Sequence, residues 1–237
     1  MHCHFNGVIM KTVAMIPHWH EYRFPDQSVS NRDTLKLGGH SLIERTVMLL
    51  QGIEQIDEIV IYSSNEQVQE LFEDSLEYSF LKRDKNLDDE NISIEDIIES
   101  FLKETDADIV LLIHPKCPFL KPDSIEDCIN KVFSGSFDSA FFGEKHKKMA
   151  WFKGEPLNYS LVSRGNTQSL SSLEPVIFES SSAYVFTRKL FDKSRRRIGK
   201  NPYIKFVSHF EGFEIDRAED YEIAELIINA GLDVLER

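Results

Sequence analysis

The sequence predicts an α/β protein with a mainly parallel β-sheet. Short apolar runs of strand length alternate with amphipathic helical patterns through the first half of the 237-residue chain. This alternation is typical of βαβ units, in which a helix crosses over between two parallel strands. Apolar residues make up 41% of the chain, which is enough for a packed core. The length fits a single domain that spans residues 1–237.

Capping residues indicate where the predicted helices begin and end. Ser41 suits the N-cap of the first helix, and Ser93 with Asp96 forms a capping box before a later one. Pro122 suits the first turn of a helix, and Gly231 follows the last helix. The predicted helices span residues 41–51, 66–72, 94–103, 122–132, 189–192 and 218–230. The predicted strands span residues 13–17, 58–62, 109–113, 138–143, 184–186 and 204–208.

One stretch, residues 145–179, interrupts the alternation of strands and helices. It is polar, rich in turn residues and weakly periodic, so we interpret it as an insertion that projects from the sheet as an arm. The arm carries apolar residues at Trp151, Phe152, Leu157 and Tyr159. Apolar side chains on such a projection are expected to pack against another subunit.

Composition and charge exclude several classes of function. A net charge of −13 argues against nucleic-acid binding, which needs clustered cations. The longest apolar run, residues 109–113, is far shorter than the roughly 20 residues of a membrane-spanning helix. The three cysteines form no CxxC pair, and residues 1–7 lack the features of a signal peptide. We therefore expect a cytoplasmic protein without a nucleic-acid or membrane partner.

The loop after the first predicted strand is the first candidate site, because ligands of open α/β sheets bind beyond the carboxyl ends of the strands. It contains His18, His20 and Arg23, and an arginine there can donate to phosphate oxygens. The two histidines could ligate a metal only if they lie on an extended chain. An ordinary surface loop is the alternative interpretation. The absence of a GxxxxGK[ST] sequence excludes a P-loop.

Two further segments have the residue types of a ligand site. His114 follows the central predicted strand and either contacts a ligand or caps the strand, while Lys116 could meet an anion. Cys117 is a candidate nucleophile or, alternatively, a small buried thiol. Glu214 and Asp216 stand at positions i and i+2, which on an extended chain places both carboxylates on one side and suits Mg²⁺. The alternative is that Asp216 caps the last helix.

Taken in chain order, several segments resemble the acylneuraminate cytidylyltransferase family, which comprises the CMP-sialic acid synthetases and their legionaminate and pseudaminate relatives. The order and spacing of the segments together carry the resemblance, which covers nearly the whole chain. The segments are VAMIP (13–17), LGGHSLI (37–43), IYSSN (61–65), KRDKNL (82–87), LIHPKCPF (112–119), the arm and the strand after it (151–186), RRRIGKNPY (195–203) and residues 213–221.

The resemblance implies a fold and a reaction. The fold is a Rossmann-like three-layer nucleotidyltransferase sheet, mostly parallel, with the arm at 145–179 serving dimerisation in a homodimer. The reaction transfers CMP from CTP to the anomeric hydroxyl of an acidic sugar, a sialic-acid-like nine-carbon ulosonic acid, and releases pyrophosphate. Mg²⁺ is the implied cofactor, and catalysis rests mainly on positioning and electrostatics.

The resemblance also implies roles for individual residues. Glu214 and Asp216 are the implied metal ligands, and Asp216 and Arg23 are the implied catalytic residues. The implied nucleotide-binding residues are His18, Arg23, Arg32, Arg83 and Ser93. The implied sugar-binding residues are His114, Arg164, Gln168, Glu179, Ser181 and Tyr184.

The sequence departs from the family pattern mainly in the first loop, where the lysine that grips the triphosphate has no clear counterpart. Either Arg23-Phe24-Pro25 or Arg32-Asp33 can be aligned with the family's basic loop, but not both without gaps. Lys116-Cys117 also replaces a Thr-Ser pair. Two alternatives to the active enzyme follow: a catalytically degenerate protein that binds nucleotide or sugar or that dimerises, and a nucleotidyltransferase for another base or for a sugar phosphate.

Overall fold

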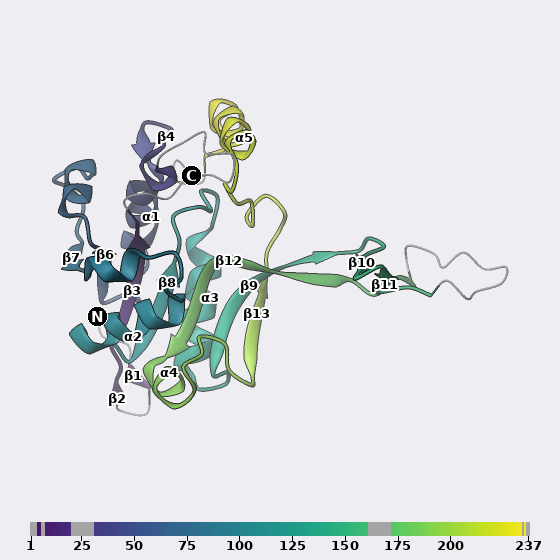
Figure 1. The fold of residues 1–237 in the computed structure, drawn as a ribbon, viewed down its shortest axis with the longest axis horizontal. Helices are drawn as coiled ribbons and strands as arrows, with labels where there is room; N and C mark the ends of the chain where they lie inside the picture. The colour runs from purple at the N-terminus through teal and green to yellow at the C-terminus, as the bar shows by residue number, and fades with distance from the viewer. Residues whose placement is uncertain (1–3, 6–7, 20–30, 161–171, 234, 236–237) are drawn as a thin grey trace.

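A seven-stranded sheet forms the centre of the protein, shown as a ribbon in Figure 1. The computed structural model describes residues 4–5, 8–19, 31–160, 172–233 and 235. The strand order is β13-β9-β12-β8-β3-β6-β7. The strands span Thr12–His18 (β3), Glu58–Ser63 (β6), Ser79–Lys82 (β7), Ile109–Ile113 (β8), Ser139–His146 (β9), Val176–Thr187 (β12) and Pro202–Phe206 (β13). Only β12 runs antiparallel to its neighbours, so the mainly parallel sheet is confirmed.

Helices cover both faces of this sheet and complete three layers. Along the central strand β3, Ala14 and Ile16 pack into one apolar core, whereas Val13 and Met15 pack into the other. This split follows from the alternation of side chains along a strand. The first core also contains α1 (Leu42–Gln51) and α3 (Pro122–Phe133), and the second contains α2 (Ile94–Glu104) and α4 (Arg188–Ser194).

The last helix, α5 (Ala218–Asn229), packs away from the two main cores. It contributes Ala224 to a third cluster with Leu37, Leu42, Phe119 and Ile215. In Figure 1 it lies at the top of the molecule, beside the label of β4. The small sheets pair β1 (His4–Phe5) with β2 (Val8–Ile9) and β4 (Lys36–Leu37) with β5 (His40–Ser41).

The predicted helix starts are confirmed. Ser41 and Ser93 each close a capping box with the residue three positions later, and Pro122 is the first residue of α3. Gly231 follows α5 with a φ of +72°, in the left-handed region that glycine adopts without steric cost. The predicted helix at 66–72 is a 3₁₀ helix, Glu66–Leu71, and two further 3₁₀ helices span Arg32–Thr34 and Lys85–Asp88.

Strands that lie partly outside the core were underestimated or missed. β7 was not predicted, because at the edge of the sheet its four side chains are only exposed or half-buried. β12 is twelve residues long, but the sequence pattern identified only its buried part around residues 184–186. The remainder of β12 is largely exposed and has no clear alternation of polar and apolar residues.

The arm is a continuation of two strands of the sheet. β9 and β12 pair beyond the sheet as far as His146 and Val176, and β10 (Trp151–Phe152) and β11 (Glu155–Pro156) form a hairpin beyond them. Figure 1 shows this ribbon extending away from the body of the protein. The hairpin turns through Lys153 and Gly154, both at positive φ, as a type I′ turn requires. Large exposed apolar side chains lie on or next to the arm at Met149, Trp151, Phe152, Leu157, Ile177, Phe178 and Phe206.

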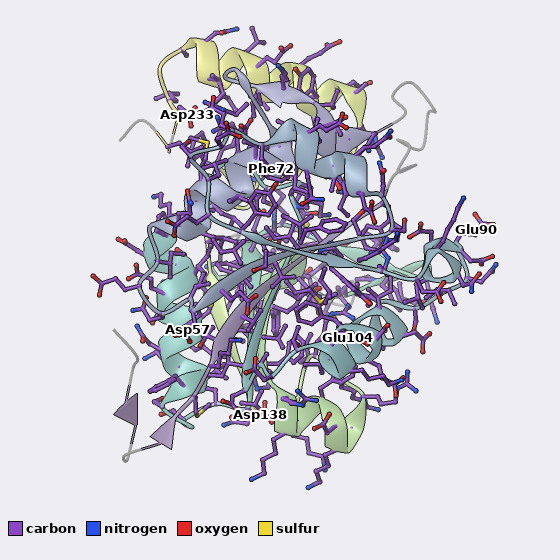
Figure 2. All side chains as sticks on the ribbon, turned by 90° about the vertical axis from the view of Figure 1, so that its left-hand side faces the viewer. Asp57, Phe72, Glu90, Glu104, Asp138 and Asp233 are labelled. Carbon is purple, nitrogen blue, oxygen red and sulfur yellow. The ribbon has the colours of Figure 1, made fainter. Side chains whose placement is uncertain are left out.

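A buried ion pair fastens the end of the chain to its first helix. The Arg45 guanidinium on α1 donates to both carboxylate oxygens of Asp233 at 2.6 and 2.9 Å and to the carbonyl of Leu37 at 3.2 Å. Both side chains are almost fully buried, and Asp233 is labelled in Figure 2. This geometry is the bidentate arrangement that arginine forms with carboxylates.

No helix among the described residues is both long enough and apolar enough to cross a membrane.

Candidate active site

The carboxyl ends of β3, β6 and β8 bring candidate site residues together at one edge of the sheet. His18 ends β3, and its ring Nδ1 lies 2.9 Å from the hydroxyl of Ser63, which ends β6. The His18 Nε2 lies 3.3 Å from the side-chain amide nitrogen of Asn31. His18 is buried, and both of its ring nitrogens have protein partners. The imidazole therefore holds the start of the first loop against the neighbouring strand.

The side chain of Arg83 contacts the ends of two strands at the same edge of the sheet. Its guanidinium donates to the carbonyl of Tyr62 at 3.1 Å and to that of His18 at 2.9 Å, and pairs with Asp88 at 2.5 Å. The ring of Trp19 lies over the guanidinium at 5.0 Å. The Arg83 side chain is almost fully buried and its charge is balanced by Asp88, so it ties the ends of β3 and β6 together.

The centre of the site is an ion cluster around Lys116. The Lys116 ammonium contacts the Glu214 carboxylate and lies 3.1 Å from an Asp216 carboxylate oxygen. A guanidinium nitrogen of Arg32 lies 3.8 Å from the same Asp216 oxygen, and Arg32 also pairs with Asp33 at 3.1 Å. Two acidic residues that precede the last helix thus meet two cations from separate segments of the chain.

The second oxygen of Glu214 is also engaged. It accepts from the hydroxyl of Ser180 at 2.6 Å and from the backbone N–H of Ser181 at 3.1 Å. Asp216, in contrast, is half exposed. The interpretation of Asp216 as a helix cap is wrong, because Arg217 is the N-cap of α5, and Asp220 accepts from the backbone N–H groups of Asp216 and Arg217.

The contacts of Lys116 keep its ammonium charged. Burial, the largest single influence, lowers the pKa of Lys116, but its hydrogen bonds and the charges of Glu214 and Asp216 together raise that pKa above the usual value. A metal ion bridging both carboxylates would have to displace this ammonium. An ion held through one carboxylate and substrate phosphates fits the half-exposed Asp216 without that displacement.

His114 lies among cations and is neutral. Its ring stacks on Trp19 with centroids 6.2 Å apart and planes 17° apart. Burial, followed by the charges of Arg32, Lys116 and Arg197, lowers the pKa of His114 to about 3. A neutral imidazole can position a ligand by a hydrogen bond but is a weak base. The backbone N–H of His114 donates to the carbonyl of Ser182 at 2.8 Å, which fixes the end of β8 against β12.

This burial of a neutral histidine predicts a pH-dependent contribution to stability. Between pH 6.5 and about 3 the unfolded state binds a proton at His114 that the folded state does not bind, so stability falls as the pH falls through this window. Replacing His114→Gln should therefore reduce the loss of unfolding free energy between pH 7 and pH 5 by about 2 kcal/mol. Urea denaturation at both pH values measures the difference, and an equal loss in both proteins would contradict the assignment.

Three of the predicted sugar-binding residues, Glu179, Ser181 and Tyr184, lie on β12. The Tyr184 hydroxyl donates to the Glu179 carboxylate at 2.7 Å, and burial followed by that contact raises the pKa of Tyr184. The guanidinium of Arg197 lies 4.5 Å above the Tyr184 ring, and its Nε is buried without a hydrogen-bond partner. Glu179 and Glu214 both line an open cavity of about 430 Å³ at the root of the arm. Ser181 is exposed next to it.

The other predicted site residues are not brought into this cluster by the described contacts. Ser93 caps α2, where its hydroxyl donates to Asp96 at 2.6 Å. Arg23, Arg164 and Gln168 lie outside the described residues, so their predicted roles stay predictions.

The sequence does not indicate the observed contacts of two cations of the site, Lys116 and Arg197. Lys116 was expected only to meet an anion, and its carboxylate partners are about a hundred positions away in sequence. Arg197 lies in the basic segment RRRIGKNPY, which was recognised without a role for any one of its residues. The thiol of Cys117 is buried, and this burial raises its pKa, which excludes the thiolate that a cysteine nucleophile needs.

Solved structures of low sequence identity share this fold. CMP:2-keto-3-deoxy-manno-octonic acid synthetase complexed with CTP matches with a TM-score of 0.69 at 13% identity, over 94% of this chain and 100% of that chain. The bifunctional IspDF from Campylobacter jejuni gives 0.64 at 14% identity, over 90% of this chain and 53% of that chain. The 4-diphosphocytidyl-2C-methyl-D-erythritol synthase from Anaerococcus prevotii DSM 20548 gives 0.62 at 13% identity, over 93% and 96%. The predicted Rossmann-like nucleotidyltransferase fold is thereby confirmed.

No curated protein sequence matches the chain. A family model described as cytidylyltransferase, in contrast, matches residues 29–232. This range contains the candidate site from Arg32 to Asp216 and runs through the last helix. The chain therefore belongs to the cytidylyltransferase family.

Proposed function

We propose that the protein transfers CMP from CTP to the anomeric hydroxyl of a sialic-acid-like ulosonic acid and releases pyrophosphate. The observation that carries this proposal is the ion cluster of Lys116, Arg32, Glu214 and Asp216 at the carboxyl edge of the sheet. It combines cations suited to phosphate oxygens with a half-exposed carboxylate, in a chain of the cytidylyltransferase family.

The choice of acceptor is supported by the sugar side of the site and by a structural relative. Arg197 presents a cation over Tyr184, close enough to His114 to influence its pKa, and an arginine is suited to a sugar carboxylate. The synthetase of similar fold is named for a 2-keto sugar acid and is complexed with CTP. A 2-keto sugar acid has the same reacting groups as the proposed acceptor.

The proposed chemistry is an in-line displacement at the α-phosphorus of CTP. The anomeric oxygen forms a bond to that phosphorus, the bond to the bridging oxygen of the β-phosphate breaks, and pyrophosphate leaves with the electron pair. The hydroxyl proton is released to solvent. Lys116 and Arg32 offset the negative charge of the phosphates, and preorganised groups of this kind are typically worth about 10²–10³ in rate.

We expect a Mg²⁺ ion to accompany the triphosphate. Mg²⁺ keeps several waters and binds through one or two carboxylates together with substrate phosphates. Asp216 is the carboxylate that such an ion can reach, because Glu214 is engaged by Lys116, Ser180 and Ser181. When bound, the ion would neutralise charge on the triphosphate and on the departing pyrophosphate.

One observation favours a second candidate, a catalytically degenerate protein that binds nucleotide or sugar. The Lys116 ammonium stands where a cation bridging Glu214 and Asp216 would lie. A protein whose lysine permanently replaced the metal could retain the site without turnover.

Pyrophosphate release separates the two candidates. The purified protein is incubated with Mg²⁺, each of CTP, UTP, ATP and GTP, and a panel of ulosonic acids of eight and nine carbons. Release only with CTP and one class of ulosonic acid is the expected result. No release with any pair, from a protein that is folded by circular dichroism, would overturn the enzymatic proposal and favour the degenerate protein.

We propose that the exposed apolar surface of the arm mediates a homodimer. Trp151 and Phe152 are more than half exposed, and residues of this kind are enriched where proteins associate. Light scattering should give twice the mass of one chain at micromolar concentration. The double substitution Trp151→Asp and Phe152→Asp should give a monomer that is still folded by circular dichroism, because both side chains are exposed within one chain. A monomeric wild-type protein would contradict the dimer.

Substitutions at two helix N-cap residues test whether Ser93 also binds the nucleotide. Ser41→Ala and Ser93→Ala each remove a capping box and should each lower the unfolding free energy by about 1 kcal/mol. If Ser93 also contacts the nucleotide, only Ser93→Ala raises KM for CTP, which we expect by several-fold. Equal KM values for both variants would limit Ser93 to capping.

A further inference from the structure

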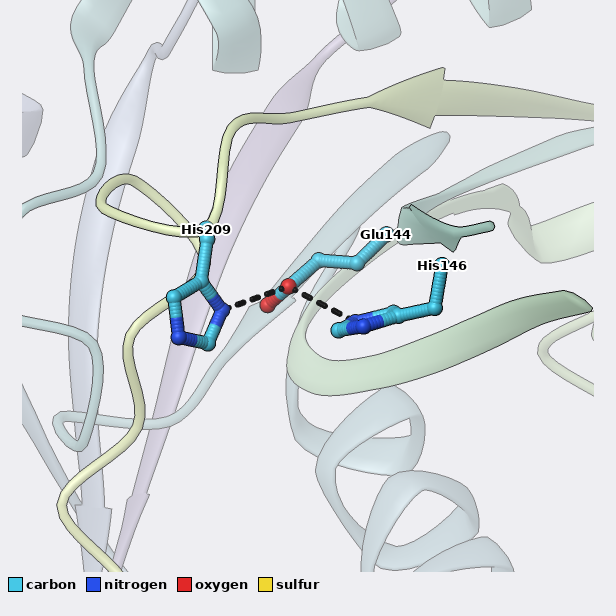
Figure 3. A group of neighbouring side chains, drawn as sticks. All are labelled: Glu144, His146 and His209. Carbon is cyan, nitrogen blue, oxygen red and sulfur yellow. Dashed lines mark hydrogen bonds and ion pairs between the residues drawn. The ribbon is translucent and has the colours of Figure 1, made fainter. Parts of the chain in front are cut away.

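We propose that Glu144, His146 and His209 form a binding site for a transition-metal ion of the Zn²⁺ class. Figure 3 shows the three side chains converging at the root of the arm. The His146 Nε2 lies 3.1 Å and the His209 Nδ1 lies 3.0 Å from one carboxylate oxygen of Glu144. One ligand atom from each residue lies within 4.8 Å of the other two. This site goes beyond the proposed nucleotidyl transfer, which does not require it.

The distances are close to those of a tetrahedral metal site. Zn²⁺ binds imidazole nitrogen and carboxylate oxygen at about 2.0–2.2 Å, so two ligands of a tetrahedral ion lie about 3.3 Å apart. Both observed nitrogen-to-oxygen distances fall within a few tenths of an ångström of that value. Two imidazoles and a carboxylate are a ligand set for zinc and related ions rather than for Mg²⁺, which prefers oxygen.

The backbone holds two of the three ligands in place. Glu144 and His146 stand two residues apart on β9, so their side chains leave the same face of the strand. A Cβ at Gly212 would lie 2.4 Å from a Glu144 carboxylate oxygen, so glycine is needed there for the carboxylate to lie where it does. The rings of Phe178 and His146 pack in a T-shaped arrangement with centroids 5.0 Å apart.

The third ligand leaves the site open to solvent and substrate. The His209 side chain is 84% exposed, whereas that of Glu144 is only 15% exposed. All three residues line the cavity of about 430 Å³ that also contains Glu179, Glu214 and Asp220. Three protein ligands with an accessible fourth position describe an open metal site, and the surrounding carboxylates favour a divalent cation.

Binding would join two parts of the chain that flank the candidate active site. β9 leads into the arm, and His209 lies in the connection from β13 to α5 that also carries Glu214 and Asp216. A bound ion would cross-link these segments directly, so it should stabilise the folded protein.

A second cluster among the described residues provides the matched control. His40, Glu44 and Glu73 also lie within 4.8 Å of one another, but they supply only one imidazole. The Glu44 carboxylate is already committed to the capping box of α1, where it accepts from the backbone N–H of Ser41 at 3.1 Å. We therefore expect His40→Ala to leave metal binding unchanged.

Cobalt substitution tests the proposal without nucleotide or sugar, so its outcome is independent of the transferase reaction. The full chain without an affinity tag is titrated with Co²⁺, whose tetrahedral complexes have intense visible absorption bands. The titrated protein, called the background protein, carries the substitutions His2→Ala, Cys3→Ser and His4→Ala, because histidine and cysteine side chains also bind metals. One equivalent of tetrahedral Co²⁺, displaced by Zn²⁺, is the expected result.

Single substitutions then assign the ligands. His209→Ala and His146→Ala should each weaken binding by at least about 100-fold, since even the outer partners of metal ligands are typically worth 10- to 100-fold. Zn²⁺ should raise the melting temperature of the background protein and of His40→Ala, but not that of His209→Ala. Because the His209 side chain is exposed, its replacement should not cause misfolding that could account for a loss of metal binding. Circular dichroism checks that His209→Ala is folded. Absence of tetrahedral Co²⁺, or an unchanged affinity in both histidine variants, would overturn the proposal.

Discussion

Replacing Asp216→Ala should reduce the rate of pyrophosphate release by about 10²–10³-fold. Asp216 is the half-exposed carboxylate of the ion cluster and contacts both Lys116 and Arg32. Its loss removes the group proposed to hold the ion on the triphosphate and also removes one of the two carboxylates that contact each of Lys116 and Arg32. The measurement is a steady-state assay with CTP and the acceptor identified in the sugar panel.

A neighbouring carboxylate provides the control for this substitution. Glu219 is exposed in the first turn of α5 and has the same formal charge. Glu219→Ala should keep the rate within about a factor of two, because a surface charge near a helix start is worth less than about 1 kcal/mol. An Asp216→Ala variant that keeps a normal melting temperature and a rate within about threefold of wild type would refute the catalytic role.

Replacing Lys116→Met should both destabilise the protein and make it responsive to Mg²⁺. The substitution leaves the carboxylates of Glu214 and Asp216 facing one another without the ammonium. Breaking a fully buried pair costs about 3–5 kcal/mol, and the exposure of Asp216 reduces this to about 2 kcal/mol. For a chain of this length, that corresponds to a decrease of about 4–8 °C in melting temperature.

Added Mg²⁺ should restore part of this loss in the variant, because the two carboxylates can then hold a divalent ion between them. In the wild type the ammonium already fills that position, so Mg²⁺ without CTP should change the melting temperature little. Lys103→Met, at an exposed lysine of α2, is the matched control and should behave as wild type. Equal melting temperatures and equal Mg²⁺ responses in Lys116→Met and wild type would show that the ion cluster has no such role.

Local signals explain why much of the fold could be predicted from the sequence. The capping boxes at Ser41 and Ser93 and the proline that opens α3 act within a few residues, so they can be recognised without knowledge of the rest of the chain. The edge strand β7 and the exposed half of β12 have no such signal, because most of their side chains are exposed or only half-buried and so show no clear alternation of polar and apolar residues.

The site was less predictable because its contacts join distant segments. The pair Glu214 and Asp216 was identified from its i, i+2 spacing, and both carboxylates do meet one ammonium. No spacing indicates that this ammonium belongs to Lys116. No spacing in the sequence indicates the contact between His209 and Glu144 either. The two residues are 65 positions apart, and the pairing of β13 with β9 brings them together.

The ion pair between Arg45 and Asp233 also affects when the protein can finish folding. Its two residues are separated by 188 positions in the sequence. During synthesis from the N-terminus, α1 leaves the ribosome long before its partner is made. Until Asp233 has been made, Arg45 lacks the carboxylate that neutralises it, so the nascent chain cannot bury this charge in its native setting. The first helix, α1, can therefore complete its native contacts only after synthesis has reached Asp233, far along the chain.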